Sequence, residues 1–247
     1  MKKITIFCDG KKWLVDKSIK TFSTHFGNVE IPEKINGIEI SEINKKKFYF
    51  YRPSIAEFIS KIKRKTQIIY PKDVAIILFY SDLKETDNVI EAGTGSGSLL
   101  TGIMSVVKKG KVITIERNEE FKEIAIKNIE SFFGNLPENL KFITGDVYDE
   151  NFNIDVEEKW ADKIYLDLPE PWRAKNLLKY LKKGGILVNY NPQITQIKKF
   201  IEGLDGFIDI NVFEILERKW LVDEKRARPV DLMRGHTGFI MIARKAE

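Results

Sequence analysis

The chain has 247 residues, which is enough for one large domain or for a small domain beside a medium-sized one. Its hydrophobic and charged fractions, 43% and 31%, are typical of a globular protein, and no apolar stretch is long enough to cross a bilayer. Cys8 is the only cysteine, which excludes an intrachain disulfide and a cysteine-based zinc cluster. The N-terminus lacks the apolar core of a secretory signal. We therefore expect a cytoplasmic protein without a metal site.

The positive charge is concentrated in the N-terminal quarter of the chain. The sequence holds 41 lysines and arginines against 36 aspartates and glutamates, a net charge of +5. Residues 1–65 carry 15 basic and 7 acidic side chains, so the remaining residues have a small negative charge. A basic module beside a near-neutral one suits a polyanionic substrate, although any single lysine run is more often an ordinary solvated surface.

Residues 1–65 are predicted to form a small basic β domain, and residues 66–247 a catalytic domain. The β-type runs of the first domain lie at residues 4–7, 12–15, 37–40 and 48–51. Turn pairs such as Asp9-Gly10 separate them. In the second domain, helices are predicted near 71–82, 98–108, 119–133, 173–182 and 194–203. Strands are predicted at 88–92, 111–116, 141–145, 161–167, 185–190, 208–216 and 237–244.

This alternation predicts an α/β fold, a doubly wound Rossmann-like sheet with right-handed crossovers. The last two predicted strands follow each other without a helix pattern between them. They are therefore expected to pair in antiparallel fashion at one edge of the sheet.

The segment Val89 to Gly97 reads V-I-E-A-G-T-G-S-G, an apolar run followed by three alternating glycines. Glycines allow a sharp turn and a close approach of the backbone to a ligand. Glu116 closes the next strand, where a carboxylate can accept hydrogen bonds from a ribose diol. The spacing E-x-G-x-G-x-G differs from the dinucleotide pattern G-x-G-x-x-G. The motif therefore favours S-adenosylmethionine over NAD, as in class I methyltransferases.

Four acidic residues, Glu91, Glu116, Asp146 and Asp167, fall at or near the carboxyl ends of predicted strands. Ligands bind at this edge of open α/β sheets. Asp146 has two interpretations, because it can accept the exocyclic amine of an adenine or close a Gly-Asp turn. The predicted cofactor-binding residues are Glu91, Gly93, Gly95, Ser96, Gly97, Ser98, Glu116, Asp146 and Asp167.

The segment Asp167-Leu-Pro-Glu-Pro-Trp172 is the second motif. Asp167 ends a strand, and the two prolines stiffen the loop that follows. We predict that Asp167 is the catalytic residue, placed beside the methyl group of the cofactor. Trp172 either stacks on a base or packs beneath the loop. The segment resembles the Asp-Pro-Pro-Tyr loop of adenine N6-methyltransferases, but its second and fourth residues differ. Methylation of an exocyclic amine therefore does not follow from this resemblance.

A third motif, Met233 to Phe239, follows a basic run at residues 225–228. Cationic side chains in a flexible connection are suited to phosphate contacts, although an ordinary charged loop would look the same. A lone histidine such as His236 is more often structural than catalytic. Tyr70 lies between the two predicted domains and can stack on a base. The predicted substrate residues are Tyr70, Pro169, Trp172, Arg226, Arg228, Arg234 and His236.

With these segments together, the chain resembles the tRNA (adenine-N1)-methyltransferases that act on the T-loop. The matching segments are residues 66–73, 91–97, 167–172 and 234–239. The resemblance implies S-adenosylmethionine as cofactor, tRNA as partner, and a homotetramer. It also implies that the glycine motif and Glu116 hold the cofactor, that Asp167 lies where cofactor and target base meet, and that Tyr70 flanks that base. Archaeal-type members of the family modify adenines at positions 57 and 58.

The expected reaction is methyl transfer to N1 of adenine 58, with 57 as a second position. Two alternatives remain: a non-catalytic tRNA-binding subunit of such an enzyme, and a methyltransferase with another acceptor such as an isoaspartyl protein. The first is disfavoured because the glycines, Glu116 and Asp167 are all present. The second is disfavoured by the proline-rich loop and the basic N-terminal module. An NAD-dependent dehydrogenase fails on glycine spacing.

Overall fold

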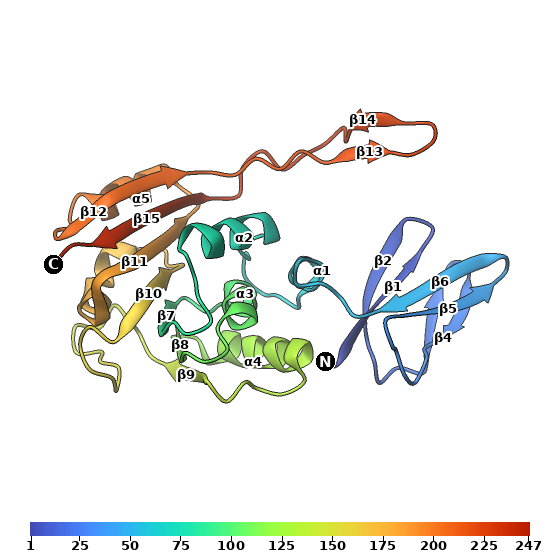
Figure 1. Cartoon of the computed structure of the whole chain (residues 1–247), viewed down its shortest axis with the longest axis horizontal. Helices are drawn as coiled ribbons and strands as arrows, with labels where there is room; N and C mark the ends of the chain where they lie inside the picture. Colours follow the sequence, from blue (N-terminus) through green and yellow to red (C-terminus); the bar gives the residue numbers. More distant parts are fainter.

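The computed structural model describes residues 1–247, and its N-terminal part is an antiparallel β domain (Figure 1). One sheet has the order β2-β1-β6-β5, and β3 and β4 form a separate hairpin. Ile6, Phe48 and Phe50 are fully buried between these strands. The strands are β1 (Lys3–Cys8), β2 (Lys11–Asp16), β3 (Thr21–Thr24), β4 (Gly27–Glu30), β5 (Ile38–Ile43) and β6 (Lys46–Tyr51). The predicted β module is confirmed, with the β3–β4 hairpin as an addition.

The C-terminal part contains a seven-stranded sheet with the order β12-β15-β11-β10-β7-β8-β9. The five strands from β11 to β9 pair in parallel, whereas β15 is antiparallel to both of its neighbours, β11 and β12. Its strands are β7 (Val89–Ala92), β8 (Val112–Glu116), β9 (Leu140–Thr144), β10 (Ala161–Leu166), β11 (Leu181–Asn191), β12 (Phe207–Phe213) and β15 (Phe239–Lys245). The predicted doubly wound sheet and the antiparallel pairing of its last two strands are confirmed.

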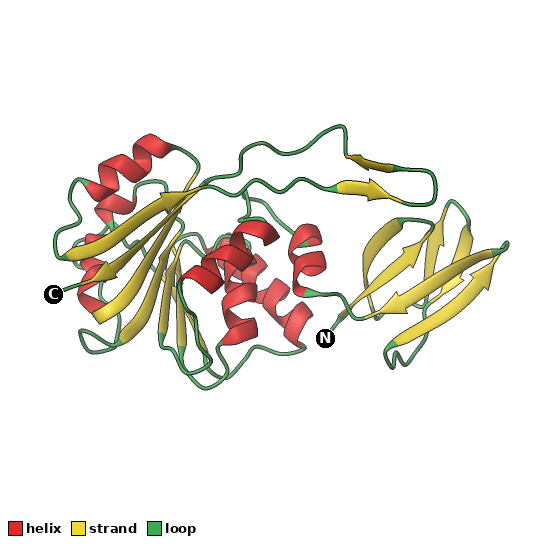
Figure 2. Ribbon diagram, turned by 45° about the horizontal axis from the view of Figure 1, so that its top comes forward, coloured by secondary structure: helices red, strands yellow, loops and turns green.

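Helices cover both faces of this sheet (Figure 2). The helices are α1 (Ile55–Lys61), α2 (Pro71–Tyr80), α3 (Ser98–Val106), α4 (Glu119–Phe133) and α5 (Ile194–Ile201). Side chains of α1 to α4 share one buried cluster, and α5 belongs to the cluster on the opposite face. None of these helices combines the length and the apolar character needed to cross a bilayer.

The prediction of a helix at residues 173–182 is wrong. The segment forms two short 3-10 turns, Pro171–Arg173 and Lys175–Tyr180, and β11 begins at once with Leu181. Leu181 pairs with Ala161 of β10, and the hydroxyl of Tyr180 accepts the amide of Ile154 at 3.0 Å. These long-range contacts outweigh the helical pattern, because they bury both side chains.

Helix α1 packs with the core of the C-terminal part, although the expected boundary at residue 65 assigns it to the first domain. Phe58, Ile59 and Ile62 are buried in the same cluster as residues of α2 and α3. The ring of Phe58 lies 4.8 Å from that of Phe132 in α4. We therefore propose that the domain boundary lies just after Tyr51, where the last strand of the β domain ends.

Residues 214–238 form a long hairpin, here called the arm, between β12 and β15. The sequence predicted only a flexible connection here. The arm carries the two-stranded ladder of β13 (Trp220–Val222) and β14 (Ala227–Pro229). It passes α2 and extends toward the N-terminal β domain (Figure 1).

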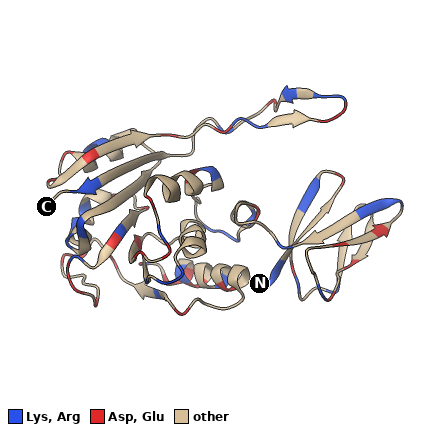
Figure 3. Cartoon of the chain, viewed as in Figure 1, with Lys and Arg blue, Asp and Glu red and all other residues tan.

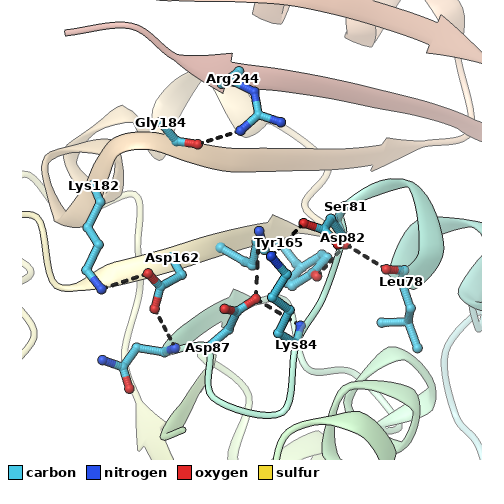
Figure 4. Close-up of polar contacts among 12 residues, drawn as sticks. Leu78, Ser81, Asp82, Lys84, Asp87, Asp162, Tyr165, Lys182, Gly184 and Arg244 are labelled. Atoms are coloured by element: carbon cyan, nitrogen blue, oxygen red, sulfur yellow. Dashed lines mark hydrogen bonds and ion pairs between the residues drawn. The ribbon is translucent and has the colours of Figure 1, made fainter.

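A polar network fixes the amino ends of the strands, away from the edge where ligands are expected (Figure 4). Asp162 at the start of β10 accepts the amide of Asn88 at 2.8 Å and the ammonium of Lys182 at 2.7 Å. The buried Tyr165 hydroxyl lies 2.7 Å from Ser81, which ends α2. These contacts join α2 to the strands, so the position of α2 relative to the carboxyl edge of the sheet is fixed.

Candidate functional site

A cleft of about 300 Å³, here called the inner cleft, lies beyond the carboxyl ends of β7 to β10. Five predicted cofactor residues line it: Gly93, Gly95, Glu116, Asp146 and Asp167. Pro169, predicted as a substrate residue, also lines it. Six of the 15 residues that line this cleft are thus ones that the sequence singled out, because parallel strands deliver their carboxyl ends to one edge of the sheet.

The glycine loop is shaped by a close backbone contact. Gly93 has φ +90°, and a Cβ atom there would lie 2.1 Å from the backbone oxygen of Asp167. No side chain fits in that space, so glycine is required. The loop thus packs directly on the strand end that carries Asp167.

Glu116 fixes the next turn of the loop and also faces the inner cleft. Its Oε2 accepts the amide of Gly95 at 2.9 Å, and its Oε1 accepts the amide of Asn118 at 3.0 Å. A carboxylate has about four acceptor sites, so each oxygen keeps capacity for another donor. The residues present therefore fit a ligand with a ribose diol at this position.

Asp146 closes a turn and also lines the inner cleft. Its Oδ1 accepts the amide of Tyr148 at 2.9 Å, which closes a turn, while the residue also lines the inner cleft. Arg117, 3.8 Å from the Asp146 carboxylate, lies over the Tyr148 ring at 5.8 Å. The Tyr148 hydroxyl accepts the amide of Glu170 at 3.0 Å. Sequence reasoning missed Arg117 and Tyr148, whose partners come from three separate loops.

Glu91 lies beneath the glycine loop and does not line the inner cleft. It pairs in register with Thr114 of β8, whose hydroxyl donates to Glu91 Oε2 at 2.6 Å. Thr114 in turn lies 2.5 Å from the hydroxyl of Thr94 in the glycine loop. Burial raises the pKa of Glu91 to about 8, and the nearby Asp167 and Glu116 add to the shift. Glu91 thus supports the loop as a carboxyl that is largely protonated at neutral pH.

Ser96, Gly97 and Ser98 also lie outside the wall of the inner cleft. The Ser98 hydroxyl donates to the carbonyl of Ile69 at 2.5 Å, and Ser96 Oγ lies 3.3 Å from the hydroxyl of Thr66. Gly97, with φ +79°, precedes the first residue of α3. These residues hold the glycine loop against the segment that leads to Tyr70.

Asp167 directly follows β10 and is partly exposed to the inner cleft. Burial raises the pKa of Asp167 to about 7, with a further contribution from Glu116. Two amides brace the following loop: Asn191 donates to the carbonyl of Leu168 at 2.7 Å, and Gln196 donates to that of Pro169 at 2.8 Å. No sequence pattern pointed to these two amides.

Trp172 packs beneath the loop, which is the second of the two interpretations given for it above. It is partly buried against the apolar cluster below α5. Lys199 of α5 lies over its ring at 4.0 Å. Trp172 lines neither the inner cleft nor the larger cleft described next.

The larger cleft, of about 510 Å³, is here called the outer cleft. The N-terminal β domain contributes Trp13, the region of α1 and α2 contributes Lys61 and Tyr70, and the arm contributes Lys219 and Arg234. Basic residues lie on the N-terminal β domain and along the arm (Figure 3). The outer cleft therefore combines aromatic and cationic groups from distant parts of the chain.

Tyr70 lies where the two clefts adjoin. It lines the outer cleft, and its hydroxyl accepts a hydrogen bond at 3.0 Å from Gln67, which lines the inner cleft. The guanidinium of Arg234 lies 4.5 Å from the centre of the Tyr70 ring. Tyr70 and Arg234, each predicted separately as a substrate residue, are therefore in contact with each other.

The remaining predicted substrate residues are engaged within the arm. Arg226 pairs with Asp223, and Arg228 pairs with Asp231 at the far end of the arm. His236 Nδ1 lies 2.9 Å from Glu214, and its Nε2 lies 2.8 Å from the carbonyl of Pro192. Its bond to Glu214 raises the pKa of His236. These three residues line neither cleft.

Comparison with known proteins gives a consistent result. Residues 49–237 match the family described as "tRNA methyltransferase complex GCD14 subunit". The chain is 36% identical to the tRNA (adenine(57)-N(1)/adenine(58)-N(1))-methyltransferase TrmI of Methanocaldococcus jannaschii, over 95% of this chain and 92% of that protein.

Two crystal structures share the fold over nearly the whole chain. A SAM-dependent O-methyltransferase from Thermotoga maritima superposes with a TM-score of 0.89 at 31% identity, covering 100% of this chain and 93% of that one. The tRNA methyltransferase TrmI from Aquifex aeolicus superposes with a TM-score of 0.85 at 32% identity, covering 99% and 97%. The chain therefore belongs to the GCD14/TrmI family of tRNA methyltransferases.

Proposed function

We propose that this protein transfers the methyl group of S-adenosylmethionine to N1 of an adenine in the T-loop of tRNA, at position 58 and also at 57. One observation carries the proposal beyond family membership: Tyr70 of the outer cleft is hydrogen-bonded to Gln67 of the inner cleft, which Asp167 also lines. A base that enters beside Tyr70 therefore approaches Asp167. The relative named for both positions, from Methanocaldococcus jannaschii, supports the inclusion of position 57.

The inner cleft is the proposed cofactor site. S-adenosylmethionine supplies an electrophilic methyl group on a sulfonium when it is bound. Gly93 and Gly95 let the backbone approach the ligand. The Glu116 carboxylate accepts hydrogen bonds from the ribose diol, and that of Asp146 accepts a hydrogen bond from the adenine amine. The other predicted cofactor residues, Glu91, Ser96, Gly97 and Ser98, act on the shape of the glycine loop rather than by contact.

Asp167 is the proposed catalytic residue, acting by position and electric field rather than as a base. Adenine N1 has an in-plane lone pair, so it forms the bond to the methyl carbon without losing a proton. The S–C bond breaks as the N–C bond forms, and the positive charge moves to the base. An ionised Asp167 that accepts a hydrogen bond from the adenine N6 amine stabilises this charge. Preorganised groups of this kind supply a few kcal/mol, and close placement of the reacting atoms supplies more.

The outer cleft is the proposed route for the RNA. A T-loop adenine must be unstacked before it reaches Asp167, which costs a few kcal/mol. Arg234 over Tyr70, together with lysines of the N-terminal β domain, is suited to offset this cost through phosphate and base contacts. Arg226, Arg228 and His236 contribute to RNA binding at most through the arm, because ion pairs and hydrogen bonds already engage them.

The protein is proposed to act in the cytoplasm as a homotetramer, in line with the family resemblance. Exposed apolar side chains support self-association: Phe79 at the end of α2 is 80% exposed, and Ile208 of the edge strand β12 is 56% exposed. Contiguous exposed apolar patches commonly mark protein interfaces.

The testing experiment incubates the protein with labelled S-adenosylmethionine and an unmodified tRNA transcript, and then maps N1-methyladenine by primer-extension stops. We expect stops at 57 and 58, and a stop at 58 alone would contradict the inclusion of position 57. A transcript with guanine at position 58 is the matched control and should lose the stop there. Cofactor binding without any tRNA methylation would contradict tRNA as the substrate. Absence of cofactor binding would contradict methyl transfer itself.

A further inference from the structure

The root of the arm is tied to α2 by one ammonium group. Lys72, in the first turn of α2, donates from Nζ to Asp73 Oδ1 at 2.7 Å, to the carbonyl of Ile215 at 2.8 Å and to Thr237 Oγ1 at 2.6 Å. An ammonium has three N–H donors, so all of them are used. Ile215 lies on the outgoing leg of the arm, and Thr237 lies on the returning leg. A single side chain therefore joins both legs to the helix.

This ion pair differs from the surface pairs of the molecule. The side chains of Lys72 and Asp73 are 11% and 0% exposed, whereas those of Lys198 and Glu202 are 76% and 59% exposed. A buried charge costs free energy unless it is paired and hydrogen-bonded. The three short contacts of Lys72 satisfy this requirement for the ammonium, whereas Asp73 Oδ2 is buried without a hydrogen-bond partner. The pair is thus a built feature of the junction between α2 and the arm.

A second cross-link lies one residue away along each leg. Glu214 precedes Ile215, His236 precedes Thr237, and the Glu214 carboxylate lies 2.9 Å from His236. His236 also contacts the carbonyl of Pro192, which follows β11. Consecutive residues on the two legs are therefore fixed to the sheet and to α2. Beyond this root the arm is largely exposed, as for Leu232 at 89% and Val222 at 75%.

The root lies next to the aromatic and cationic pair of the outer cleft. Arg234 is three residues before Thr237, and Tyr70 is two residues before Lys72. Pro71 links Tyr70 to Lys72 and begins α2, so this connection is stiff. The 4.5 Å approach of Arg234 to the Tyr70 ring thus connects the same two segments that Lys72 joins.

We propose that Lys72, with Asp73 and Thr237, is a positioning residue for RNA binding: it fixes the root of the arm so that Arg234 stays over Tyr70. This inference rests on the proposed function, because its catalytic consequence is read out with tRNA. Lys72 and Thr237 line the outer cleft, and neither residue lines the inner cleft. Loss of the Lys72 contacts therefore lowers kcat/KM for tRNA and leaves the cofactor Kd unchanged.

The first test uses Thr237→Val, which removes one contact and keeps the buried Lys72–Asp73 pair. Loss of a hydrogen bond to a charged group predicts a fall in kcat/KM for tRNA of about tenfold, with the cofactor Kd unchanged. Thr237→Ser should restore activity. Lys72→Met should give a larger loss, and Lys109→Met, which removes an exposed lysine paired with Glu85, should give none. Wild-type kcat/KM in Thr237→Val and Lys72→Met would overturn the proposal.

The second test is a double-mutant cycle with Arg234→Ala. If Lys72 acts by holding Arg234, Thr237→Val should cost much less in the Arg234→Ala background than in the wild type, whereas independent effects add. Additive losses would overturn the proposal.

Hydrogen exchange supplies a readout that does not depend on the substrate. Backbone amides at residues 214–219 and 230–238 should exchange faster in Thr237→Val than in the wild type. Unchanged exchange would overturn the positioning role of Lys72, even if the enzyme is active. If Thr237→Val exchanges faster but the wild-type protein itself fails to methylate tRNA, the positioning role of Lys72 is retained and the proposed function is contradicted.

Discussion

The two clefts of this molecule are built in different ways. The inner cleft is formed by strand ends and loops of one sheet, and hydrogen bonds such as those of Glu116 with Gly95 and Asn118 lock its wall. The outer cleft is assembled from the N-terminal β domain, the region of α1 and α2, and the arm. Its parts are joined by side-chain contacts, including Lys12 with Glu57 and Arg234 with Tyr70.

This difference in construction matches the difference in the proposed ligands. A small cofactor requires fixed acceptors and a loop that approaches closely, which the inner cleft provides. A folded RNA requires dispersed cationic and aromatic groups that act over a larger surface. Three carboxyls and one arginine line the inner cleft, whereas five lysines and arginines and two glutamates line the outer cleft. Substitutions in one cleft should therefore leave the affinity for the ligand of the other cleft largely unchanged.

The largest expected effect comes from Asp167→Ala in the inner cleft. Removal of one preorganised group that stabilises transition-state charge commonly lowers kcat by about 10² to 10³-fold. Cofactor affinity should fall much less. Single-turnover methylation of tRNA, with cofactor binding by calorimetry, measures both. Near-wild-type turnover in this variant would remove Asp167 from its catalytic role.

Gly93→Ala should break the inner cleft by geometry alone. The new Cβ would meet the backbone oxygen of Asp167, and a left-handed conformation costs a further ~1–2 kcal/mol for a residue with a side chain. Gly184→Ala is the matched control, because Gly184 has φ +79° but a Cβ atom there would meet no other atom within 4 Å. We expect Gly93→Ala to lose cofactor binding and much stability, and Gly184→Ala to lose only a little stability. Equal effects in thermal unfolding and calorimetry would contradict the close-packed loop.

Arg234→Ala and Tyr70→Ala should weaken only the outer cleft. Loss of an aromatic stacking platform costs about 1–3 kcal/mol, so the KM for tRNA should rise by about tenfold. The cofactor Kd should stay unchanged. Filter binding of tRNA with parallel cofactor titration tests the separation. A matching loss of cofactor affinity would show that the two clefts are not independent.

The smallest expected effect is a change in how stability depends on pH. The pKa of Glu91 is about 8 in the folded protein, above the value of about 4.3 in an unfolded chain. Because the folded state binds this proton more tightly, the contribution is fully present below about pH 4 and is lost as the pH rises through about 8. Tm should therefore fall as the pH rises from about 5 to 8 and level off above about 8, and Glu91→Gln should flatten the decline. The exposed Glu123→Gln is the control, and an identical slope in all three proteins would contradict a raised pKa.

The inner cleft was largely predictable from the sequence because its residues are set by local patterns. The apolar runs that end in Glu116 and Asp167 mark strand ends, and helix α4 begins after the cap Asn118 and keeps its predicted limits. Parallel pairing then places these ends together. The same pattern could not tell that Ser98 and Glu91 support the loop from beneath, because that depends on the partner side chain.

The outer cleft was less predictable because its contacts join distant segments. Lys72 reaches partners 143 and 165 residues away along the chain, and neither Ile215 nor Thr237 has a distinctive pattern of its own. The arm's hairpin lacks an Asn-Gly type of turn, so a flexible connection was the natural prediction. Tyr70 and Arg234 were identified by residue type and family resemblance, whereas their stacking required the fold.

The most direct test of two physically distinct clefts is the salt dependence of binding for both ligands on the same protein. Affinity for tRNA should fall steeply between 50 and 200 mM salt, by about 10³-fold or more for a site with several phosphate contacts, while affinity for S-adenosylmethionine should barely change. Arg234→Ala should lower only the tRNA slope, by about one unit on the log–log plot. Equal slopes for the two ligands would contradict the division of roles between the clefts.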